Sequence, residues 1–434
     1  MGKIKDIYNN YVVRNMVYLG VGNGLSQLFN MVAVILITGF FCPTEYGKYA
    51  FMMSQALLLS VVADMGMRNI IIRDIARNLN EKISVFSTAF IIILLSNLLL
   101  FGIYFCYNHF LGELDLFQLL LISLYSVILC LNNLCESIFM GSQKMAPISF
   151  WNILTSSVWL LFIWVMPKEH ISVNFLFVAS LVLFATKFIC CFIQLIAIRK
   201  YSLIGKVQRS KIIDLIVRSA PYLGLALVAL PANYLSNNFL QLNSTEEQIG
   251  FFSLGQKLTN PLTVVFAIIF SATFPNMSVL WSNDKPKFFK TSEKGIAYFI
   301  LFASFCSFLF CLLIEPVFKL FFDVQYLQAI NVCKLMVWHV CLMGICSLIG
   351  TIWGAMNKEK LAFHTAIINA AINIPLLWLG SKYGAESISV AYIVSFSIFI
   401  VILWLVFLKT NKPRKEITYA WLPAILLFIL SLYY

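Results

Sequence analysis

The sequence predicts an all-α polytopic membrane protein: two six-helix bundles related by pseudo-twofold symmetry, with room for a thirteenth helix. Of its 434 residues, 61% are hydrophobic and only 12% are charged, and the mean hydropathy is +0.87. A soluble domain carries about 25% charged residues, and its surface could not accommodate so much apolar area. The apolar residues recur in runs of about 20, which is the length that crosses a hydrocarbon core. No soluble segment is long enough to form an enzyme domain.

The apolar runs are expected to be helices, because backbone polar groups at lipid depth must be hydrogen-bonded within their own segment. The expected spans are 12–38, 44–65, 83–107, 117–141, 147–166, 172–198, 214–242, 249–281, 293–314, 330–356, 361–380 and 385–409, with a weaker one at 417–433. The first run exceeds the apolar core of a cleavable signal peptide, and no small-residue cleavage site follows it, so we expect no cleavage.

The basic residues predict the orientation of the chain. If the N-terminus is cytoplasmic, most of the 31 lysines and arginines fall in inner connections. The exceptions are Lys48, Lys168, Lys319 and Lys382 in outer connections, and Lys187, Lys257 and Lys334 inside helices. The positive-inside rule therefore predicts a multi-pass inner-membrane protein with a cytoplasmic N-terminus. The net charge of +12 then reflects loops beside anionic lipid rather than binding of nucleic acid.

The chain is expected to form two halves separated by its longest inner connection. Six spans precede this connection, so both halves begin on the same side, as in parallel repeats. We predict an N-terminal bundle, an inter-lobe loop, a C-terminal bundle and a tail helix, at 1–198, 199–213, 214–409 and 410–434. Amide side chains repeat between the halves, since Asn23 and Gln27 align with Asn233 and Asn237 at one common offset.

Metal, cofactor and nucleotide sites are not expected. The eleven cysteines are scattered through the apolar runs without a CxxC pair, which indicates small apolar side chains rather than metal ligands or disulfides. No GxxxxGK[ST] phosphate-binding loop occurs, which argues against an ATP-driven pump.

Several short motifs follow one another in order. They are CPTEYGKY at 42–49, DMGM at 64–67, RDIAR at 73–77, SAPY at 219–222, IGFFSLGQKL at 249–258 and GAMNK at 354–358. Their order and spacing resemble the Wzx-type polysaccharide repeat-unit (O-antigen) flippases, within the multidrug/oligosaccharidyl-lipid/polysaccharide exporter superfamily. The resemblance covers the first twelve expected helices. The thirteenth departs from the usual twelve and leaves the side of the C-terminus open.

The resemblance implies two six-helix bundles around a cavity lined mainly by the helices at 12–38, 44–65, 214–242 and 249–281. It implies a cargo of oligosaccharide on polyprenyl (undecaprenyl) pyrophosphate, moved from the cytoplasmic to the periplasmic leaflet by alternating access coupled to an ion gradient. The expected partners are this lipid-linked oligosaccharide, membrane lipids, and the polysaccharide polymerase and chain-length regulator.

A cargo of this kind needs a wet, polar path with a positive centre. Amide side chains both donate and accept hydrogen bonds and therefore suit sugar hydroxyls. They form helical stripes at Asn23, Gln27 and Asn30, and at Asn233, Asn237 and Gln241. Hydrogen bonding between helices is the alternative use of these amides.

Two lysines inside helices are candidates for binding the pyrophosphate. Lys257 lies about 12 Å into the 249–281 helix, with Ser253 and Asn260 on its face, and snorkelling to the outer interface is the alternative. Lys187 lies near the middle of the 172–198 helix and needs a cavity or a partner, for which Glu136 is the nearest candidate.

The remaining candidates concern ion coupling and the cytoplasmic entrance. His339 and His364 could titrate near neutral pH and couple an ion gradient, although packing is the alternative for both. Arg14 is expected beside the first amide stripe as a first contact for the cargo. The 73–77 segment could dock the pyrophosphate or anchor its loop to lipid headgroups.

Three alternatives to this function stay open. A multidrug or toxic-compound exporter would share the fold but have a smaller, more acidic or aromatic site. A peptidoglycan-precursor flippase typically has fourteen helices and an arginine-rich cavity. A polysaccharide polymerase or ligase generally carries a large periplasmic loop, whereas the outer connections here are short, so we expect no enzyme.

Overall fold

The computed structural model describes residues 11–77, 82–112, 114–167, 171–197, 209–411 and 416–431. Within these ranges the secondary structure is helical, without strands, which confirms the predicted all-α class. The long helices are α2 (Tyr11–Thr38), α3 (Pro43–Ala63), α4 (Met67–Arg77), α5 (Lys82–Leu111), α6 (Leu116–Gly141), α7 (Ala146–Val165), α8 (Val173–Ala197), α9 (Arg209–Asn233), α10 (Leu235–Asn243), α11 (Glu246–Asn283), α12 (Lys285–Phe321), α13 (Ala329–Ala355), α14 (Glu359–Ser381), α15 (Ala385–Asn411) and α16 (Glu416–Ser431).

The protein is a multi-pass membrane protein. Among the described residues, eleven helices are long and apolar enough to cross a membrane, and the bent pair α3 and α4 would make a twelfth. The shorter apolar segment Trp421–Ser431 lies within α16, where the sequence predicts its weaker thirteenth helix. The helix ends lie within a few residues of the predicted spans, except at the two breaks described next and in α12, which begins eight residues before the predicted 293–314 span and ends seven residues after it.

The first break separates α3 from α4, which the sequence did not predict as a helix. Met65 and Gly66 have positive φ angles of 49° and 69°, and the two helices meet at 51°. A side chain at Gly66 would collide with the backbone between Tyr222 and Leu223 of α9, so this left-handed turn favours glycine twice over. The turn directs α4 against α6 and so determines where Arg68 lies.

The second break divides the predicted 214–242 helix into α9 and α10. Tyr234 has a φ of −133°, outside the helical range. Pro231 precedes this break by three residues, and proline cannot donate the helical hydrogen bond to the preceding turn. The first residues of α9 also lie within the predicted inter-lobe loop, whose residues 199–208 are outside the described ranges.

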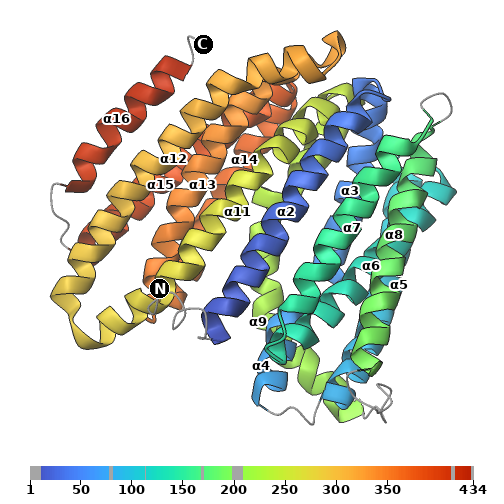
Figure 1. Cartoon of the computed structure of the whole chain (residues 1–434), viewed down its shortest axis with the longest axis horizontal. Coiled ribbons are helices and arrows are strands. Elements are labelled where there is room, and N and C mark those ends of the chain that lie inside the picture. The colour runs from blue at the N-terminus through green and yellow to red at the C-terminus, as the bar shows by residue number, and fades with distance from the viewer. Residues whose placement is uncertain are drawn as a thin grey trace, which may run out of the picture. The chain divides into compact units, whose positions relative to one another are not determined.

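The chain folds into two compact helical units. Unit 1 contains Met1–Ala33 and Lys48–Leu230, and unit 2 contains Val34–Gly47 and Pro231–Tyr434. In unit 1, α6 packs against α4, α5 and α8, and α7 packs against α8 (Figure 1). Its core is apolar and includes Ile75, Phe139 and Ile148, all at most 2% exposed.

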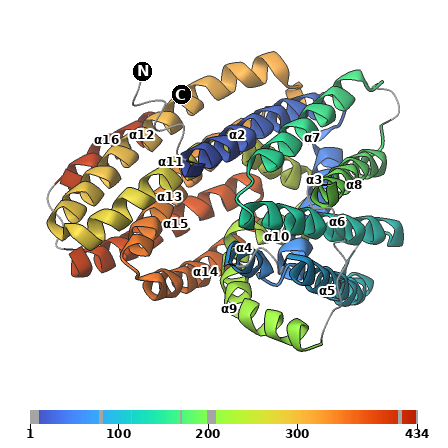
Figure 2. The ribbon, with the colours of Figure 1, turned by 60° about the horizontal axis from the view of Figure 1, so that its bottom comes forward.

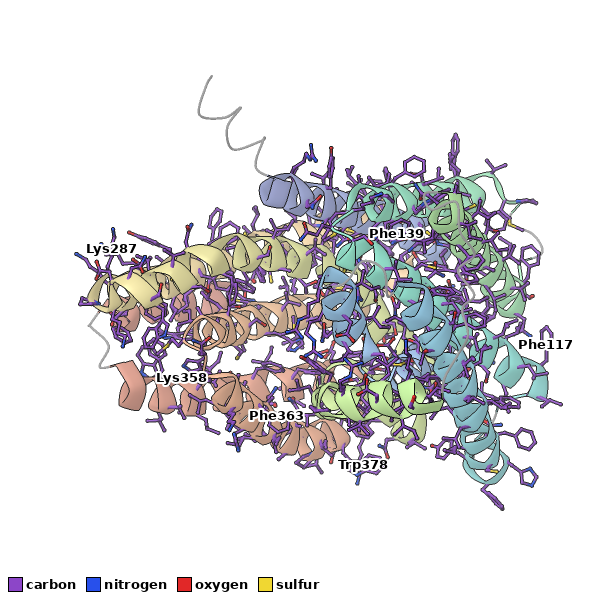
Figure 3. All side chains as sticks on the ribbon, turned by 90° about the horizontal axis from the view of Figure 1, so that it is seen from below. Phe117, Phe139, Lys287, Lys358, Phe363 and Trp378 are labelled. Carbon is purple, nitrogen blue, oxygen red and sulfur yellow. The ribbon has the colours of Figure 1, made fainter. Side chains whose placement is uncertain are left out.

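Unit 2 is organised around α13, which packs against α11, α12 and α15. The C-terminal helix α16 runs beside α12 (Figures 1 and 2). Trp338 of α13 donates a hydrogen bond to the Ser431 hydroxyl at 2.9 Å, and its ring meets Phe428 edge-on. Lys287 and Lys358, from two connections predicted to be cytoplasmic, lie at the same end of unit 2 (Figure 3).

The turn between α2 and α3 is held tightly within unit 2. A side chain at Gly47 would collide with the backbone of Glu246, and one at Gly250 would collide with the backbone of Pro43, so the start of α3 meets α11 backbone to backbone. Tyr326 is fully buried beside this crossing and donates a hydrogen bond to the Phe41 carbonyl at 2.8 Å.

Replacing Tyr326 with phenylalanine is expected to lower the free energy of unfolding by about 1–2 kcal/mol, because the buried Phe41 carbonyl loses its donor. Burial raises the pKa of Tyr326, so the hydroxyl stays protonated and the effect should not depend on pH near neutrality. Thermal unfolding of the purified protein measures the change. Tyr383→Phe, at a side chain that is 81% exposed, is the matched control. Equal changes in the unfolding temperature of Tyr326→Phe and Tyr383→Phe would contradict a stabilising hydrogen bond from Tyr326 to the Phe41 carbonyl.

Candidate functional site

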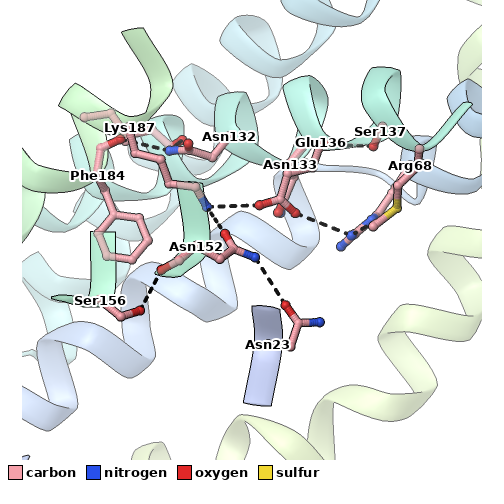
Figure 4. A network of polar contacts seen from close by, with 12 residues as sticks. Asn23, Arg68, Asn132, Asn133, Glu136, Ser137, Asn152, Ser156, Phe184 and Lys187 are labelled. Carbon is pink, nitrogen blue, oxygen red and sulfur yellow. Dashed lines mark hydrogen bonds and ion pairs between the residues drawn. The ribbon is translucent and has the colours of Figure 1, made fainter. Parts of the chain in front are cut away.

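Lys187 of α8 is the centre of a polar network inside unit 1 (Figure 4). Its ammonium donates hydrogen bonds to Glu136 Oε1 of α6 at 3.0 Å and to Asn152 Oδ1 of α7 at 2.7 Å. The other oxygen of Glu136 lies 3.6 Å from the Arg68 guanidinium of α4. The Asn152 amide nitrogen donates to Asn23 Oδ1 of α2 at 3.2 Å. Five helices therefore contribute to one connected group, and Glu136 is the partner of Lys187 that the sequence predicted.

The network lies well inside the membrane-crossing helices. Asn152 is about 9 Å from the start of α7 and Lys187 about 15 Å from the end of α8, at 1.5 Å per residue. The side chains of Lys187 and Glu136 are 8% and 14% exposed, whereas that of Arg68 is 39% exposed. A lone charge at such depth is costly, which accounts for the pairing. Solvent therefore reaches the network at Arg68, whereas the protein covers Lys187.

Small residues bring the contributing helices close enough for these contacts. A Cβ at Gly141 would lie 2.8 Å from Ile75 Cβ, so this glycine lets the end of α6 approach α4. A Cβ at Gly22 would lie 2.5 Å from Ser149 Cβ, so a second glycine lets α2 approach α7. The Ser149 hydroxyl then donates to the Tyr18 carbonyl at 2.6 Å. These approaches position Arg68 beside Glu136 and Asn23 beside Asn152.

Side-chain hydrogen bonds fix α8 against its neighbours next to the network. Asn132 of α6 donates to the Phe184 carbonyl of α8 at 3.0 Å, one turn before Lys187. Trp151 of α7 donates to Gln194 Oε1 of α8 at 2.6 Å. Lys187 therefore has little freedom to leave the group, since α8 is tied to α6 and α7 on either side.

The amide stripes differ in their surroundings. In unit 1, Asn23 is exposed and bonded to Asn152, while Gln27 and Asn30 are half-buried. In unit 2, Gln241 is half-buried and Asn237 is buried, and the Asn237 side-chain oxygen has no hydrogen-bond partner among the described residues. The side chain of Asn233 lies outside the described part of the structure. An unpaired amide oxygen can accept a hydrogen bond from water or a ligand.

Lys257 of α11 differs from Lys187 because its charge is not paired. Its side chain is exposed on unit 2, and within the described ranges no hydrogen bond or ion pair reaches it. Lys257 lies on the same face of α11 as Gly250, two turns further along the helix. Ser253, between them, is buried and has no hydrogen-bond partner in the described part of the chain, and Asn260 is half-buried. The ammonium is therefore available to an anion from outside the chain.

The two histidines have opposite environments. The His339 ring is buried between Tyr392 and Phe396, at centroid distances of 4.4 and 4.9 Å. Neither ring nitrogen has a hydrogen-bond partner among the residues that the structure describes. His364 is exposed, and its Nδ1 faces the Lys360 carbonyl. A proton reaching His339 would meet aromatic rings rather than a carboxylate.

A second charged cluster in unit 1 involves the predicted 73–77 segment. Asp74 accepts a 2.6 Å hydrogen bond from Arg218 of α9, which also pairs with Asp214 at 2.7 Å. Arg73 lies 3.5 Å from the same Asp74 carboxylate, and Arg14 is half-buried on α2. The ion pair between Asp74 and Arg218 ties α4 to α9. Much of the charge of this cluster is therefore paired within unit 1.

Sequence reasoning missed Arg68 and Asn152 as members of the network. Arg68 was assigned to an inner connection because α4 was not predicted. Asn152 is a single amide in the apolar 147–166 run. An isolated polar side chain in such a run indicates a polar partner on another helix, and this was the signal that could have identified it. Among the described residues no cluster of histidine, cysteine, aspartate or glutamate has metal-binding geometry.

Comparisons with known proteins agree with this architecture. The family model described as polysaccharide biosynthesis protein matches residues 12–281. A comparison with curated protein sequences gave no match. Among solved structures, the chain is similar to "Lipid II flippase MurJ, inward closed conformation", with a TM-score of 0.74 and 16% identity over 95% of this chain and 92% of that one.

Multidrug transporters share the same fold. The chain is similar to an inward-facing multidrug resistance MATE family transporter of the MOP superfamily, with a TM-score of 0.64 and 14% identity over 92% of this chain and 99% of that one. For an outward-facing structure of a MATE transporter the TM-score is 0.58, with 13% identity over 96% of both chains. The family match covers more than half of the sequence, so the chain belongs to the polysaccharide biosynthesis protein family and has the fold of MurJ and the MATE transporters.

Proposed function

We propose that the protein is a flippase, not an enzyme, for an oligosaccharide repeat unit carried on polyprenyl pyrophosphate. It would move the repeat unit of an O-antigen or similar surface polysaccharide from the cytoplasmic to the periplasmic leaflet of a bacterial inner membrane. The N-terminus would be cytoplasmic, and the lobes at 1–198 and 214–409 would alternate access to the cargo.

The proposal rests chiefly on one observation: a member of the polysaccharide biosynthesis family holds a charged and amide network inside its membrane-crossing helices. The cargo combines an anionic diphosphate, which requires cations, with a glycan, whose hydroxyls require donors and acceptors. Lys187 and Arg68 supply the cations for the diphosphate, and Asn152 and Asn23 supply hydrogen-bond donors and acceptors for the glycan. A hydrophobic drug would need neither group at this depth.

The other candidate residues have roles in the same proposal. Lys257 and Arg14 would contact the diphosphate, and the amides at 27, 30, 233, 237, 241 and 260 would line the path for the glycan. His339 and His364 would be the candidates for ion coupling. The polysaccharide polymerase and the chain-length regulator would receive the flipped unit, and membrane lipids would surround its tail.

A deletion strain tests the proposed function. Without the protein, the lipid-linked repeat unit should accumulate unpolymerised and protected from a glycan-labelling reagent added to intact spheroplasts, because it remains on the inner leaflet. Restoring the chain should restore both labelling and surface polysaccharide. Normal surface polysaccharide together with drug accumulation in the deletion strain would contradict the proposal and favour a multidrug exporter.

A further inference from the structure

Glu136 lies between the two cations of the network. Glu136 directs Oε1 to the Lys187 ammonium at 3.0 Å and Oε2 to the Arg68 guanidinium at 3.6 Å. Asp64, the nearby acid at the α3–α4 turn, interacts with the charge and backbone N–H of Arg68. Glu136 is therefore the carboxylate that bridges the two cations, with one oxygen for each.

We propose that Arg68 and Lys187 form the binding site for the cargo's phosphoanhydride group, and that Glu136 occupies this site while the protein is empty. The proposal deepens the flippase function and rests on it. A phosphate group, like a carboxylate, presents paired anionic oxygens, and it binds both guanidinium and ammonium groups. It could therefore take the place of Glu136 between the same two cations.

The exposure of the three side chains gives the anion a route into the site. Arg68 is 39% exposed, whereas Lys187 and Glu136 are largely covered. The Arg68 guanidinium has five N–H donors. Among the described residues its side chain approaches Glu136 at 3.6 Å and the Met140 sulfur at 3.8 Å, and its charge interacts with Asp64. An incoming anion therefore meets Arg68 first, and only then competes with Glu136 for Lys187.

Lys187 can remain in place when Glu136 is displaced. Asn152 Oδ1 accepts its second hydrogen bond at 2.7 Å, and α8 is tied to α6 through Asn132. The amide nitrogen of Asn152 continues to the exposed Asn23. Polar amides thus adjoin Lys187, as a ligand with a hydroxyl-rich group next to its diphosphate would require.

A competing carboxylate and a purely structural ion pair predict opposite effects for Glu136→Gln. If Glu136 competes with the ligand, glutamine keeps the shape, removes the competing charge and strengthens anion binding. If the pair is structural only, the substitution leaves two cations without their anion, loosens the fold and gives no gain in binding. Tighter anion binding by Glu136→Gln therefore indicates a competing carboxylate, and no gain in binding indicates a structural ion pair.

The experiment measures binding of inorganic pyrophosphate to the purified full chain in nanodiscs by calorimetry, at fixed ionic strength. Each variant is made with and without Lys257→Gln, so that binding at Lys257 does not mask the site in unit 1. Glu136→Gln is expected to bind about tenfold more tightly than the wild type. Arg68→Gln is expected to bind about tenfold more weakly than the wild type, and the double variant Lys187→Met/Glu136→Gln about tenfold more weakly than Glu136→Gln.

Glu315→Gln is the matched control, since Glu315 pairs with Lys319 at 2.8 Å on an exposed part of α12. It should bind pyrophosphate as the wild type does. If Glu136→Gln does not fold, Arg68→Gln decides the question, because it leaves Lys187 paired with Glu136. Wild-type affinity in Arg68→Gln, unchanged affinity in a folded Glu136→Gln, or a double variant that binds as tightly as Glu136→Gln would overturn the proposal.

Flipping by the wild type is measured separately in proteoliposomes. Flipping together with unchanged affinity in the folded variants would overturn the anion site and leave the flippase function standing. The expected pattern of affinities without flipping of any lipid-linked saccharide would support the anion site and overturn the flippase function.

Discussion

Lys187→Met is expected to destabilise the protein by about 3 kcal/mol, because it leaves Glu136 buried with only the 3.6 Å contact to Arg68. It also removes the donor to Asn152 Oδ1. Adding Glu136→Gln should restore most of the lost stability, since replacing both members of a buried pair is often nearly neutral. Chemical denaturation of the three purified variants measures the two differences.

Lys319→Met is the control for this prediction. Lys319 also pairs with a glutamate, but its side chain is 66% exposed and its partner 41% exposed, so solvent already screens both charges. Its unfolding transition should match that of the wild type. A Lys187→Met protein as stable as the wild type, or a double variant less stable than the single one, would show that the pair is not a coupled buried unit.

Lys257→Ala is expected to reduce polysaccharide export at least about tenfold without changing the unfolding temperature. The ammonium has no partner within the described ranges, so removing it leaves no group behind uncompensated. Without the ammonium, the bound cargo loses one charge-assisted hydrogen bond, which contributes about 1.5–3 kcal/mol to its binding free energy. Surface polysaccharide in a complemented deletion strain measures export, and thermal unfolding measures stability.

Two further variants separate charge from position at Lys257. Lys257→Arg keeps the charge and should retain most of the export, whereas Lys287→Ala removes a lysine from the end of unit 2 and should leave export unchanged. Full export by a stably inserted Lys257→Ala protein would show that this lysine only snorkels to the membrane surface.

The sequence predicted the helices well because hydrophobic length is a strong signal in a membrane protein. The ends of α6, for example, lie within one residue of the predicted 117–141 span. The α3–α4 turn was missed because it depends on the contact of Gly66 with α9, which no local pattern contains. The break at Tyr234 had a local signal in Pro231, which the apolar periodicity outweighed.

The candidate site was predictable where a buried charge demanded a partner. Lys187 required an acid, and Glu136 was the nearest one on a neighbouring helix. Arg68 could not be placed, because its position follows from the missed turn and from the small residue at Gly141. Asn23 joins the network because Gly22 lets α2 approach α7, and such close approaches are set by packing rather than by periodicity. The roles of the amides, of Lys257 and of the histidines stay predictions.

Flipping by the purified protein in proteoliposomes tests the central claim most directly. The vesicles would contain a polyprenyl-pyrophosphate-linked oligosaccharide with a fluorescent sugar, and a membrane-impermeant reagent would quench the outer leaflet over time. The wild type is expected to expose the protected half of the lipid, and Lys257→Ala is expected to do so at least about tenfold more slowly. Quenching that stops at half the fluorescence with the wild type, as in vesicles without protein, would contradict the proposed flippase function.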